Sequence, residues 1–528
     1  MKEDVLDQLR SLREGKSGGP ESVSSDHIIN GPLEKLAEVL ATLFTALLTH
    51  GVCPPSLASG TLSPIPKGKK SAESSDSWRQ IALSSVFGKV LDKVFLSSEN
   101  DKLVSTDLQY AYKRGFSTSQ CTFNLMETIS YYNLKKTTVY VVLLDASRAF
   151  DRVNLVKLFR ELRSRGVNPL VIRFLLSMYA IQCLSVKWRN TETGFFPATN
   201  GVRQGGVHSP IFFTVYVDCL FQRLAKSGLG CYMGSIFVGC LGFADDVALV
   251  APTVNALSHL VSISVAFAEE FDILFNGSKS KFLVFRHAGD LSSQQSIQIG
   301  PDTIVEVLSD VHLGHRLDTA DMAGALVKEA KGSFWASVNK LLGSFGAVRP
   351  DILSRLFSAY CTSFYGSPLW NYKSYVEVAN TWRTALKRVW DLPRETHREL
   401  VALVSSTLPL EVSLRKRFCK FTQSGLGGPS KVTGSIMRLV RGNHLSTFNS
   451  NINHIVSLYG FDLDEYSSLN FDAFFRDGWH RGVPGDLHAV AAELRGILLS
   501  DVRGEPRGTP PAYYEHEREE LVALLATM

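Results

Sequence analysis

The chain lacks the cysteine patterns of a disulfide-stapled or zinc-binding protein. Its 528 residues include eight cysteines, but no Cys-x-x-Cys pair and no Cys/His group at zinc-finger spacing. Scattered thiols of this kind are typical of a reduced intracellular protein, in which most of them are buried.

Membrane signals and a strong net charge are also missing. The first residues, MKEDVLDQLRSLREGK, are too charged for a signal peptide, and the apolar run LAEVLATLFTALL is short and interrupted by Glu38. We therefore expect no membrane span and no membrane partner. A formal net charge of +5 is small for this length, so nucleic-acid binding would have to come from local basic clusters.

The sequence does contain enough apolar residues for several cores. A chain of 528 residues is too long for one core and predicts two to four domains. Strand-like and helical patterns alternate over the first three hundred residues, whereas the pattern from about Asp321 onward is mostly helical. SGLGGPSKVTG, residues 424–434, is typical of a linker, and a Pro/Gly break in the tail precedes a final short helix.

Local patterns predict several individual elements. Thr137 to Leu144 predict a strand, followed by a turn and a helix that stops at Gly166. Ser209 suits the N-cap of a later helix, and Pro210 suits its first position. An amphipathic helix is expected over residues 31–51, with a core face made of Leu33, Leu36, Leu40, Leu43 and Leu47.

Two adjacent carboxylates, Asp245 and Asp246, stand in the otherwise apolar run LGFADDVALVAP. Ionised carboxylates seldom survive burial unless they are paired or ligated, although a lone acidic pair is more often a solvated turn. A third carboxylate, Asp145, ends the apolar strand VYVVLL and projects from the end of that strand. If the strands are neighbours, all three carboxylates converge.

Converging carboxylates repel one another and raise each other's pKa, unless cations neutralise them. Mg²⁺ favours a few carboxylates together with water and phosphate oxygens. Two such ions about 3.5–4 Å apart can activate a hydroxyl and stabilise the leaving oxygen in phosphoryl transfer. Asp145, Asp245 and Asp246 therefore predict a divalent metal site.

The order of further sequence blocks carries a family resemblance. These blocks are, in order, GKSGGPESVS, LSPIPKGKK, SWRQIALSSVFGKVLDKV, LLDASRAFDRV, GVRQGGVHSPIFF, FADDVALVAP, FNGSKSKFLVF and HLGHRL. Over roughly residues 1 to 425 the chain resembles a reverse transcriptase of the non-LTR retrotransposon (LINE) type.

This resemblance implies an α+β right-hand polymerase with fingers, a palm with an antiparallel sheet, and a thumb, followed by a mostly α-helical C-terminal region. Fingers and palm would occupy residues 1–320, a helical thumb with a basic extension 321–424, and a mostly helical region of uncertain role 425–528. The implied activity is RNA-directed DNA polymerisation with two Mg²⁺ ions, or Mn²⁺ as a substitute. The implied partners are an RNA template, a DNA primer and dNTPs, in the nucleus or the cytoplasm.

Carried over position by position, the resemblance assigns catalytic roles. It gives the metal ligands as Asp145, Asp245, Asp246 and the backbone carbonyl of Ala146. Lys279 matches the lysine proposed to protonate the leaving pyrophosphate, although Lys281 lies close to it in sequence.

The resemblance also assigns contacts to the incoming nucleotide and the primer. Lys67 and Arg79 would grip the triphosphate, for which their charges are suited. Phe150 would be a steric gate against a 2′-hydroxyl, although an aromatic residue taken alone is more often a core residue. The remaining assignments are Gln204 and Gly205 in a loop beside the nucleotide and template, and Leu313 and Gly314 in the primer-grip turn.

Other polar residues are expected to be structural. His312 and His315 are not expected to bind metal, and Asp151 and Asp218 would be a helix cap and a solvated helix residue. Two basic clusters are expected to contact nucleic-acid phosphates. One comprises Lys67, Lys69, Lys70, Arg79, Lys89 and Lys93, and the other comprises Arg383, Lys387, Arg388, Arg394, Arg398, Arg415, Lys416, Arg417 and Lys420.

Full-length elements of this family usually add an endonuclease, and many add a zinc knuckle. The sequence leaves no room for a nuclease before Gly15 and has no Cys/His cluster after Cys419. The chain is therefore expected to be a fragment, a truncated copy, or a polymerase served by a separate endonuclease. Two alternatives remain open: an RNA-templated RNA polymerase, and a non-catalytic or truncated element-derived nucleic-acid-binding protein. Retention of all three aspartates argues against the second.

Overall fold

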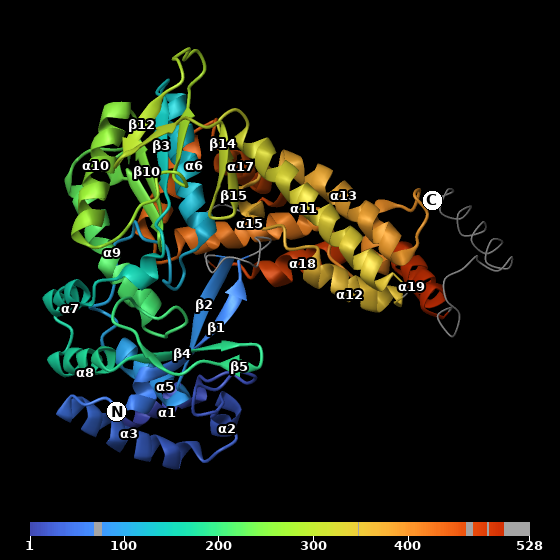
Figure 1. Ribbon diagram of the computed structural model, residues 1–528. Helices are drawn as coiled ribbons and strands as arrows, with labels where there is room; N and C mark the ends of the chain where they lie inside the picture. Colours follow the sequence, from blue (N-terminus) through green and yellow to red (C-terminus); the bar gives the residue numbers. More distant parts are fainter. Residues whose placement is uncertain (68–76, 347, 461–467, 483–484, 501–528) are drawn as a thin grey trace.

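The computed structural model describes residues 1–67, 77–346, 348–460, 468–482 and 485–500. The described part combines helices with mostly antiparallel sheets (Figure 1). The predicted α+β fold class is therefore confirmed. The final short helix expected in the tail lies outside the described residues.

The fingers region consists of N-terminal helices and a small sheet. Its elements are α1 (Lys2–Arg10), α2 (Ser25–Ile29), α3 (Leu33–His50), α4 (Pro55–Ala58), β1 (Ser59–Pro66), β2 (Trp78–Ser84), α5 (Val86–Ser98), α7 (Leu155–Ser164), α8 (Pro169–Ala180), β4 (Cys183–Trp188), β5 (Thr191–Glu192) and β6 (Phe196–Pro197). The strand order is β2-β1-β4-β5, with β6 on β4 and with β1 parallel to β4. Strands β1 and β2 pair antiparallel.

The palm region surrounds a four-stranded antiparallel sheet. Its elements are α6 (Thr118–Leu134), β3 (Val139–Leu144), the 3₁₀ helix η2 (Ala149–Arg152), α9 (Ser209–Lys226), β7 (Tyr232–Met233), β8 (Ile236–Phe237), β9 (Cys240–Phe243), β10 (Asp246–Ala251), α10 (Val254–Glu270), β11 (Lys281–Phe285), β12 (Ser296–Ile299), β13 (Asp302–Val305), β14 (Ser309–His312) and β15 (His315–Asp318). The strand order is β11-β3-β10-β9.

Side chains alternate between the two faces of the palm sheet. Val141 and Leu143 of β3 share a core with α6, whereas Val142 and Leu144 share a core with α9 and α10. Strands covered on both faces read as continuous apolar runs, which explains the sequence VYVVLL. The sheet is therefore a rigid support for residues at the strand ends.

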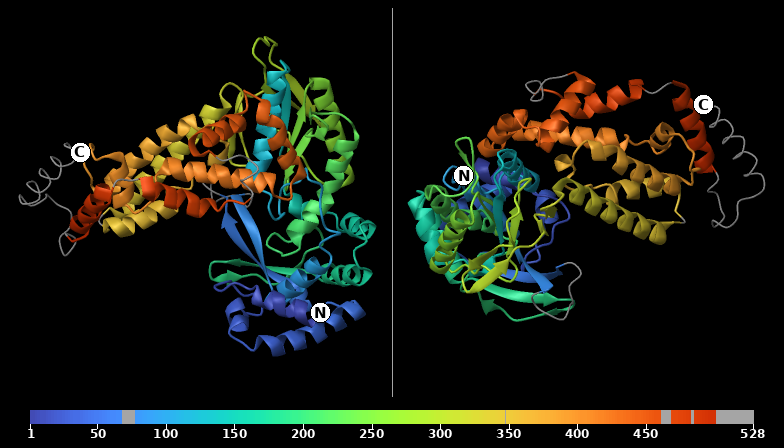
Figure 2. Two further views of the ribbon diagram at one scale, coloured as in Figure 1. Left: turned by 180° about the vertical axis from the view of Figure 1, so that it is seen from behind. Right: turned by 90° about the horizontal axis from the view of Figure 1, so that it is seen from above.

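The remaining helices follow the palm strands in the sequence, and most of them form a long arm that extends away from the palm (Figures 1 and 2). They are α11 (Met322–Phe345), α12 (Pro350–Tyr360), η3 (Ser367–Leu369), α13 (Lys373–Trp390), α14 (Arg398–Val404), α15 (Leu410–Leu426), α16 (Lys431–Leu439), η4 (Val440–Gly442), α17 (Thr447–Tyr459), α18 (Phe471–Gly482) and α19 (Gly485–Ser500). Helix α16 returns to the palm and packs on α6.

The predicted linker at residues 424–434 is wrong. Its residues form the end of α15, a short turn and the start of α16, and Ser430 and Thr433 are buried. Ser430 caps α16 by accepting a hydrogen bond from the Thr433 N–H, 3.2 Å away. The Gly/Ser/Pro composition therefore marks a tight helix-to-helix turn rather than a flexible connection.

Two smaller expectations need correction. Leu43 is 44% exposed, and the core face of α3 uses Ala37, Ala41 and Phe44 instead. Helix α9 begins at Ser209, so His208 takes the N-cap position one residue earlier than predicted. The cysteines match their expectation, because all eight are free and six are buried.

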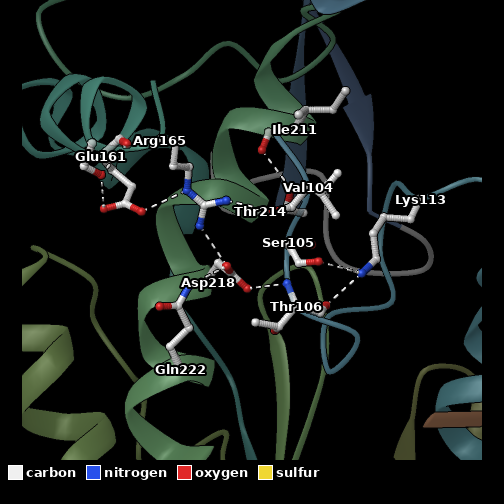
Figure 3. A network of polar contacts seen from close by, with 11 residues as sticks. Val104, Ser105, Thr106, Lys113, Glu161, Arg165, Ile211, Thr214, Asp218 and Gln222 are labelled. Carbon is white, nitrogen blue, oxygen red and sulfur yellow. Dashed lines mark hydrogen bonds and ion pairs between the residues drawn. The ribbon is translucent and has the colours of Figure 1, made fainter. Parts of the chain in front are cut away.

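Asp218 is not the solvated helix residue that was expected. It is 1% exposed, and its carboxylate lies 2.8 Å from the Arg165 guanidinium and accepts a hydrogen bond from the Thr106 N–H at 2.7 Å (Figure 3). Arg165 also pairs with Glu161 on α7. This buried network joins α9 and α7 to the segment that leads into α6, a connection that spacing in the sequence does not reveal.

Candidate active site

The acidic pair lies at the tip of the hairpin formed by β9 and β10. Asp246 is opposite Phe243, so Ala244 and Asp245 are the two turn residues. Ala244 has φ +59°, as tight hairpin turns need at their first central residue. A non-glycine residue in this conformation costs energy and persists only when its surroundings hold it in place.

Asp145 reaches the same edge of the palm sheet from the neighbouring strand. Val247 of β10 is opposite Leu144 of β3 in an antiparallel pair. Asp246, which precedes Val247, and Asp145, which follows Leu144, therefore lie at the same end of the two strands. Burial raises the pKa of Asp245, and the Asp145 charge raises it further, whereas Arg79 lowers it. Desolvation raises the pKa of Asp246 to about 6, and the charges of Asp245 and Asp145 contribute to that rise. The three carboxylates thus lie within electrostatic reach of one another.

The donor chemistry of this cluster fits a hard divalent cation. Carboxylate oxygens are the ligands that Mg²⁺ prefers, and a cation would relieve the repulsion that raises both pKa values. Across the residues that the structure describes, no three His, Cys, Asp or Glu side chains are gathered closely enough to hold one metal ion. The carboxylates therefore converge as neighbours rather than as a closed chelate.

The raised pKa of Asp246 predicts a pH-dependent stability difference in the metal-free protein. The folded state binds this proton more tightly than the unfolded chain, so the contribution of Asp246 to stability is lost as pH rises from about 4 to about 6. Asp246→Asn should therefore raise the melting temperature relative to wild type at pH 7, and this difference should shrink at pH 4. Thermal unfolding in EDTA measures it, and an equal difference at both pH values would contradict the assignment.

Lys279 lies beside Asp145 in the loop before β11. Its Nζ atom is 3.9 Å from Asp145 Oδ1, and the lysine side chain is 57% exposed. The loop is held by Asn276, whose N–H donates to the Asp145 carbonyl at 2.9 Å. Lys281, the alternative candidate, pairs with Leu143 inside the sheet. The geometry thus favours Lys279 over Lys281 for chemistry at the carboxylate cluster.

Two predicted nucleotide contacts come from the fingers. Arg79 is exposed on β2, and its charge lowers the pKa of Asp245. Lys67, at the end of β1, lies near η2, where its charge and that of Arg148 lower the pKa of Asp151 against the larger effect of burial. Asp151 is part of η2 rather than a helix cap. The ribbon of β1 and β2 therefore brings both cations to the edge of the palm.

Phe150 is half-buried in η2 and stacks on Phe213 of α9, with 4.4 Å between ring centroids and 15° between planes. Its carbonyl accepts a hydrogen bond from the Val202 N–H at 2.9 Å. One face of the ring thus belongs to the core. The rest of the ring is partly exposed.

Gln204 and Gly205 join the palm to the fingers. The Gln204 carbonyl accepts a hydrogen bond from the Ala82 N–H at 2.6 Å. Gly205 has φ +100°, and a Cβ atom there would lie 2.9 Å from the Ala82 carbonyl oxygen. A side chain at this position would therefore strain the backbone and push β2 away.

The predicted primer-grip turn is the two-residue turn between β14 and β15. Leu313 and Gly314 both have positive φ, 51° and 75°, which suits a type I′ hairpin. Tyr365 donates a hydrogen bond to the Leu313 carbonyl at 2.9 Å and stacks on His315. Burial lowers the pKa of both His312 and His315 to about 4, so both imidazoles are neutral at pH 7.

The basic cluster expected in the arm is largely engaged within the protein. Arg383 is only 8% exposed and pairs with Glu411, so its assignment as a phosphate contact is wrong. Arg417 donates to the carbonyls of residues 362 and 363, and Lys416 and Lys420 pair with Asp472. Helix amphipathicity alone could not separate these buried or paired cations from free ones.

The basic residues expected to form one cluster in the fingers do not all lie in the same environment. Lys89 and Lys93 have pKa values lowered by burial, and Lys93 donates a hydrogen bond to Ser11. Lys69 and Lys70 lie outside the described residues. Among the described members of this cluster, Lys67 and Arg79 lie near the edge of the palm, where their charges lower the pKa values of Asp151 and Asp245 respectively.

Two residues that the sequence did not single out lie at the site. Gln109 is fully buried against the turn that carries Asp245. Tyr112 is 51% exposed and has φ +57°, and its pKa is raised by burial and by the Asp245 charge. Both belong to the segment LQYAY, whose composition gives little signal beyond one polar residue among apolar ones.

The region around this site is similar to known proteins. Residues 65–315 match the family model for reverse transcriptase (RNA-dependent DNA polymerase). The chain is 26% identical over 226 residues to the Pol polyprotein of the type-1 retrotransposable element R2 from Nasonia vitripennis, covering 43% of this chain and 22% of that protein. It is 23% identical over 299 residues to the RNA-directed DNA polymerase of the mobile element jockey from Drosophila funebris, covering 54% of this chain and 32% of that protein.

A solved structure of telomerase from Candida tropicalis is also similar, with 12% identity, a TM-score of 0.38, and coverage of 82% of this chain and 74% of that one. The chain spans less than a third of the length of the two curated relatives described above. No helix in the described ranges is both long and apolar enough to cross a membrane.

Proposed function

We propose that this chain, whose residues 65–315 are a reverse transcriptase domain of the non-LTR retrotransposon type, is an RNA-directed DNA polymerase that extends a primer with dNTPs. One observation carries the proposal: within that domain, Asp145, Asp245 and Asp246 lie within electrostatic reach at the edge of a rigid sheet. A polymerase needs such a site because phosphoryl transfer is catalysed mainly by positioning and charge stabilisation.

The proposed metal site uses these carboxylates and the Ala146 carbonyl. Two Mg²⁺ ions, or Mn²⁺ in their place, would activate the primer hydroxyl and stabilise the leaving oxygen when bound there. Residues 145 and 147 are tied to the loop before β11 by two backbone hydrogen bonds, which fix the backbone on both sides of Ala146. The sheet and this loop together fix the direction in which the donor atoms point.

Lys279 is the proposed acid for the leaving group. Its ammonium lies close to Asp145 but is still more than half exposed, so it can reach a pyrophosphate leaving from the edge of the sheet. Arg79 and Lys67 would bind the triphosphate from the fingers side, where a forked arginine suits phosphate oxygens. Phe150 would pack beneath the sugar of the incoming nucleotide and exclude a 2′-hydroxyl.

The proposed partners are an RNA template and a DNA primer. Gln204 and Gly205 lie at the junction of palm and fingers, which supports a role beside the nucleotide and template. The turn of Leu313 and Gly314 is braced by Tyr365, which supports its role as a primer grip. A separate endonuclease would supply primer ends, and the reaction would take place in the nucleus or the cytoplasm.

Primer extension with matched substrates tests this function. A labelled DNA primer on an RNA template should be extended in Mg²⁺ with dNTPs, and EDTA should stop the reaction. Extension with NTPs alone would identify an RNA polymerase instead. Binding of the primed template without any extension would identify a nucleic-acid-binding protein and would overturn the proposal.

A further inference from the structure

A short segment between α5 and α6 runs alongside the catalytic hairpin and extends its edge. The Tyr110 N–H donates to the Gly242 carbonyl at 2.7 Å, and the Gly242 N–H donates to the Leu108 carbonyl at 2.8 Å. Gln109 and Gly242 thereby form a parallel β-bridge. Strand β9 is therefore held by β10 on one side and by this segment on the other.

Gln109 binds the backbone of the catalytic turn through its side chain. Its Oε1 atom accepts a hydrogen bond from the Ala244 N–H at 2.9 Å, and its Nε2 atom donates to the Ala244 carbonyl at 3.2 Å. The same Oε1 atom accepts from the Ala111 N–H at 3.0 Å, and Gln109 is 0% exposed. One buried amide thus satisfies both backbone polar groups of the residue that precedes Asp245.

Ala244 requires this support for two reasons. Its φ of +59° is unfavourable for a residue with a side chain, so the turn would relax without external contacts. It is also 5% exposed, and a buried N–H or C=O without a partner is costly. Loss of the amide would therefore favour a rearranged turn, and any rearrangement moves Asp245 and Asp246.

We propose that Gln109 is a positioning residue that fixes the turn of Ala244 and Asp245, and that helix α16 supports it from behind. This inference rests on the proposed polymerase function. Gln109 touches no reacting atom, and it acts by holding the carboxylates in the geometry that catalysis needs.

The support from α16 passes through the residue after Gln109. Asn124 of α6 donates hydrogen bonds to the Tyr110 hydroxyl and, at 3.1 Å, to Thr433 Oγ1. Ser430 donates to the same Thr433 oxygen at 3.0 Å. All four residues are at most 2% exposed. The start of the C-terminal region thus completes the packing behind the catalytic hairpin, which gives this region a role in the polymerase.

The chain offers a matched control for testing Gln109. Asn451 of α17 is 1% exposed and makes the same pair of backbone contacts, donating to the Trp370 carbonyl and accepting from the Tyr372 N–H, both at 2.8 Å. Gln109→Met and Asn451→Leu each keep the approximate size of the side chain. The first removes three side-chain hydrogen bonds to the backbone, and the second removes two. Both variants should lose thermal stability, because each leaves at least two backbone groups without their side-chain partner.

Only Gln109→Met should change the catalytic parameters. Its kcat for single-nucleotide addition should fall at least about tenfold, because small displacements of reacting groups are costly. The Mg²⁺ concentration for half-maximal rate should rise, while the Kd for primed template should stay within about twofold, since phosphate contacts set that affinity. Asn451→Leu should leave all three quantities within about twofold of wild type.

Hydrogen exchange provides a readout that does not depend on activity. In the metal-free protein, amides of residues 240–247 should exchange faster in Gln109→Met than in wild type, and at the wild-type rate in Asn451→Leu. If Gln109→Met does not fold, Gln109→Glu retains an oxygen for the Ala244 N–H and should show smaller changes in the same direction.

Equal kcat, Mg²⁺ dependence and exchange in the Gln109 and Asn451 variants would overturn the inference. Absence of extension by wild type would contradict the proposed function instead. In that case the exchange rates would still decide whether Gln109 holds the turn, so the two failures are distinguishable.

Discussion

Asp245→Asn should lower the rate of primer extension by about a hundredfold to a thousandfold, the range seen when a group that stabilises transition-state charge is removed. The amide has the shape of the carboxylate but cannot offer a negative charge to a divalent cation. The pKa of Asp245 is raised by the charge of Asp145 and lowered by the charge of Arg79. Asp245 therefore lies between the proposed metal ligand on the palm and the proposed nucleotide contact on the fingers. Single-turnover nucleotide addition on an RNA template measures the effect.

The fold should survive this substitution. Burial and the Asp145 charge raise the pKa of Asp245, so the charged carboxylate is under electrostatic strain and a neutral amide relieves it. The melting temperature of metal-free Asp245→Asn should therefore equal or exceed that of wild type at pH 7. Asp101→Asn, at an exposed position after α5, is the matched control and should retain full activity. Retained activity in Asp245→Asn would contradict the assignment of the site.

Phe150→Ala should reduce the preference for dNTPs over NTPs by about a hundredfold, a typical limit for rejecting a hydroxyl by shape alone. The ring stacks on Phe213 on one side and remains half-buried, so its removal would open space beneath the sugar if Phe150 is the proposed gate. The ratio of kcat/KM for dATP and ATP on the same primed template measures the preference. The change should come mainly from faster NTP incorporation.

A purely structural role for Phe150 predicts a different result. Loss of the stack on Phe213 would then lower the melting temperature and slow both nucleotides equally. Phe345→Ala, which removes a half-exposed ring at the end of α11, is the control and should leave the sugar preference unchanged. An unchanged preference in Phe150→Ala would contradict the gating role.

The sequence predicted the centre of the site because its signals are local. The apolar runs around Asp145 and Asp245 specify strands, and acidic residues at strand ends point to a metal site. Gln109 could not be found in this way, since it lies 135 residues from Ala244 and meets it only through the paired backbones of the folded palm. The fold's long-range pairing, rather than any motif, creates that contact.

The same limit explains the errors in the arm. A Gly/Ser/Pro-rich stretch predicts a break in helical structure, and a break does occur before Ser430. Composition does not reveal that Thr433 packs behind the catalytic hairpin, because that depends on which surface the next helix meets. Likewise, the charge of Arg383 is visible in the sequence, but its buried pairing with Glu411 is not.

The most direct test of the account is the rate of DNA primer extension on an RNA template, measured for wild type and Asp245→Asn side by side in Mg²⁺ and dNTPs. The account predicts template-dependent extension by wild type and a loss of about a hundredfold to a thousandfold in the variant. Equal extension by the two proteins, or no extension by wild type that binds the primed template, would contradict it.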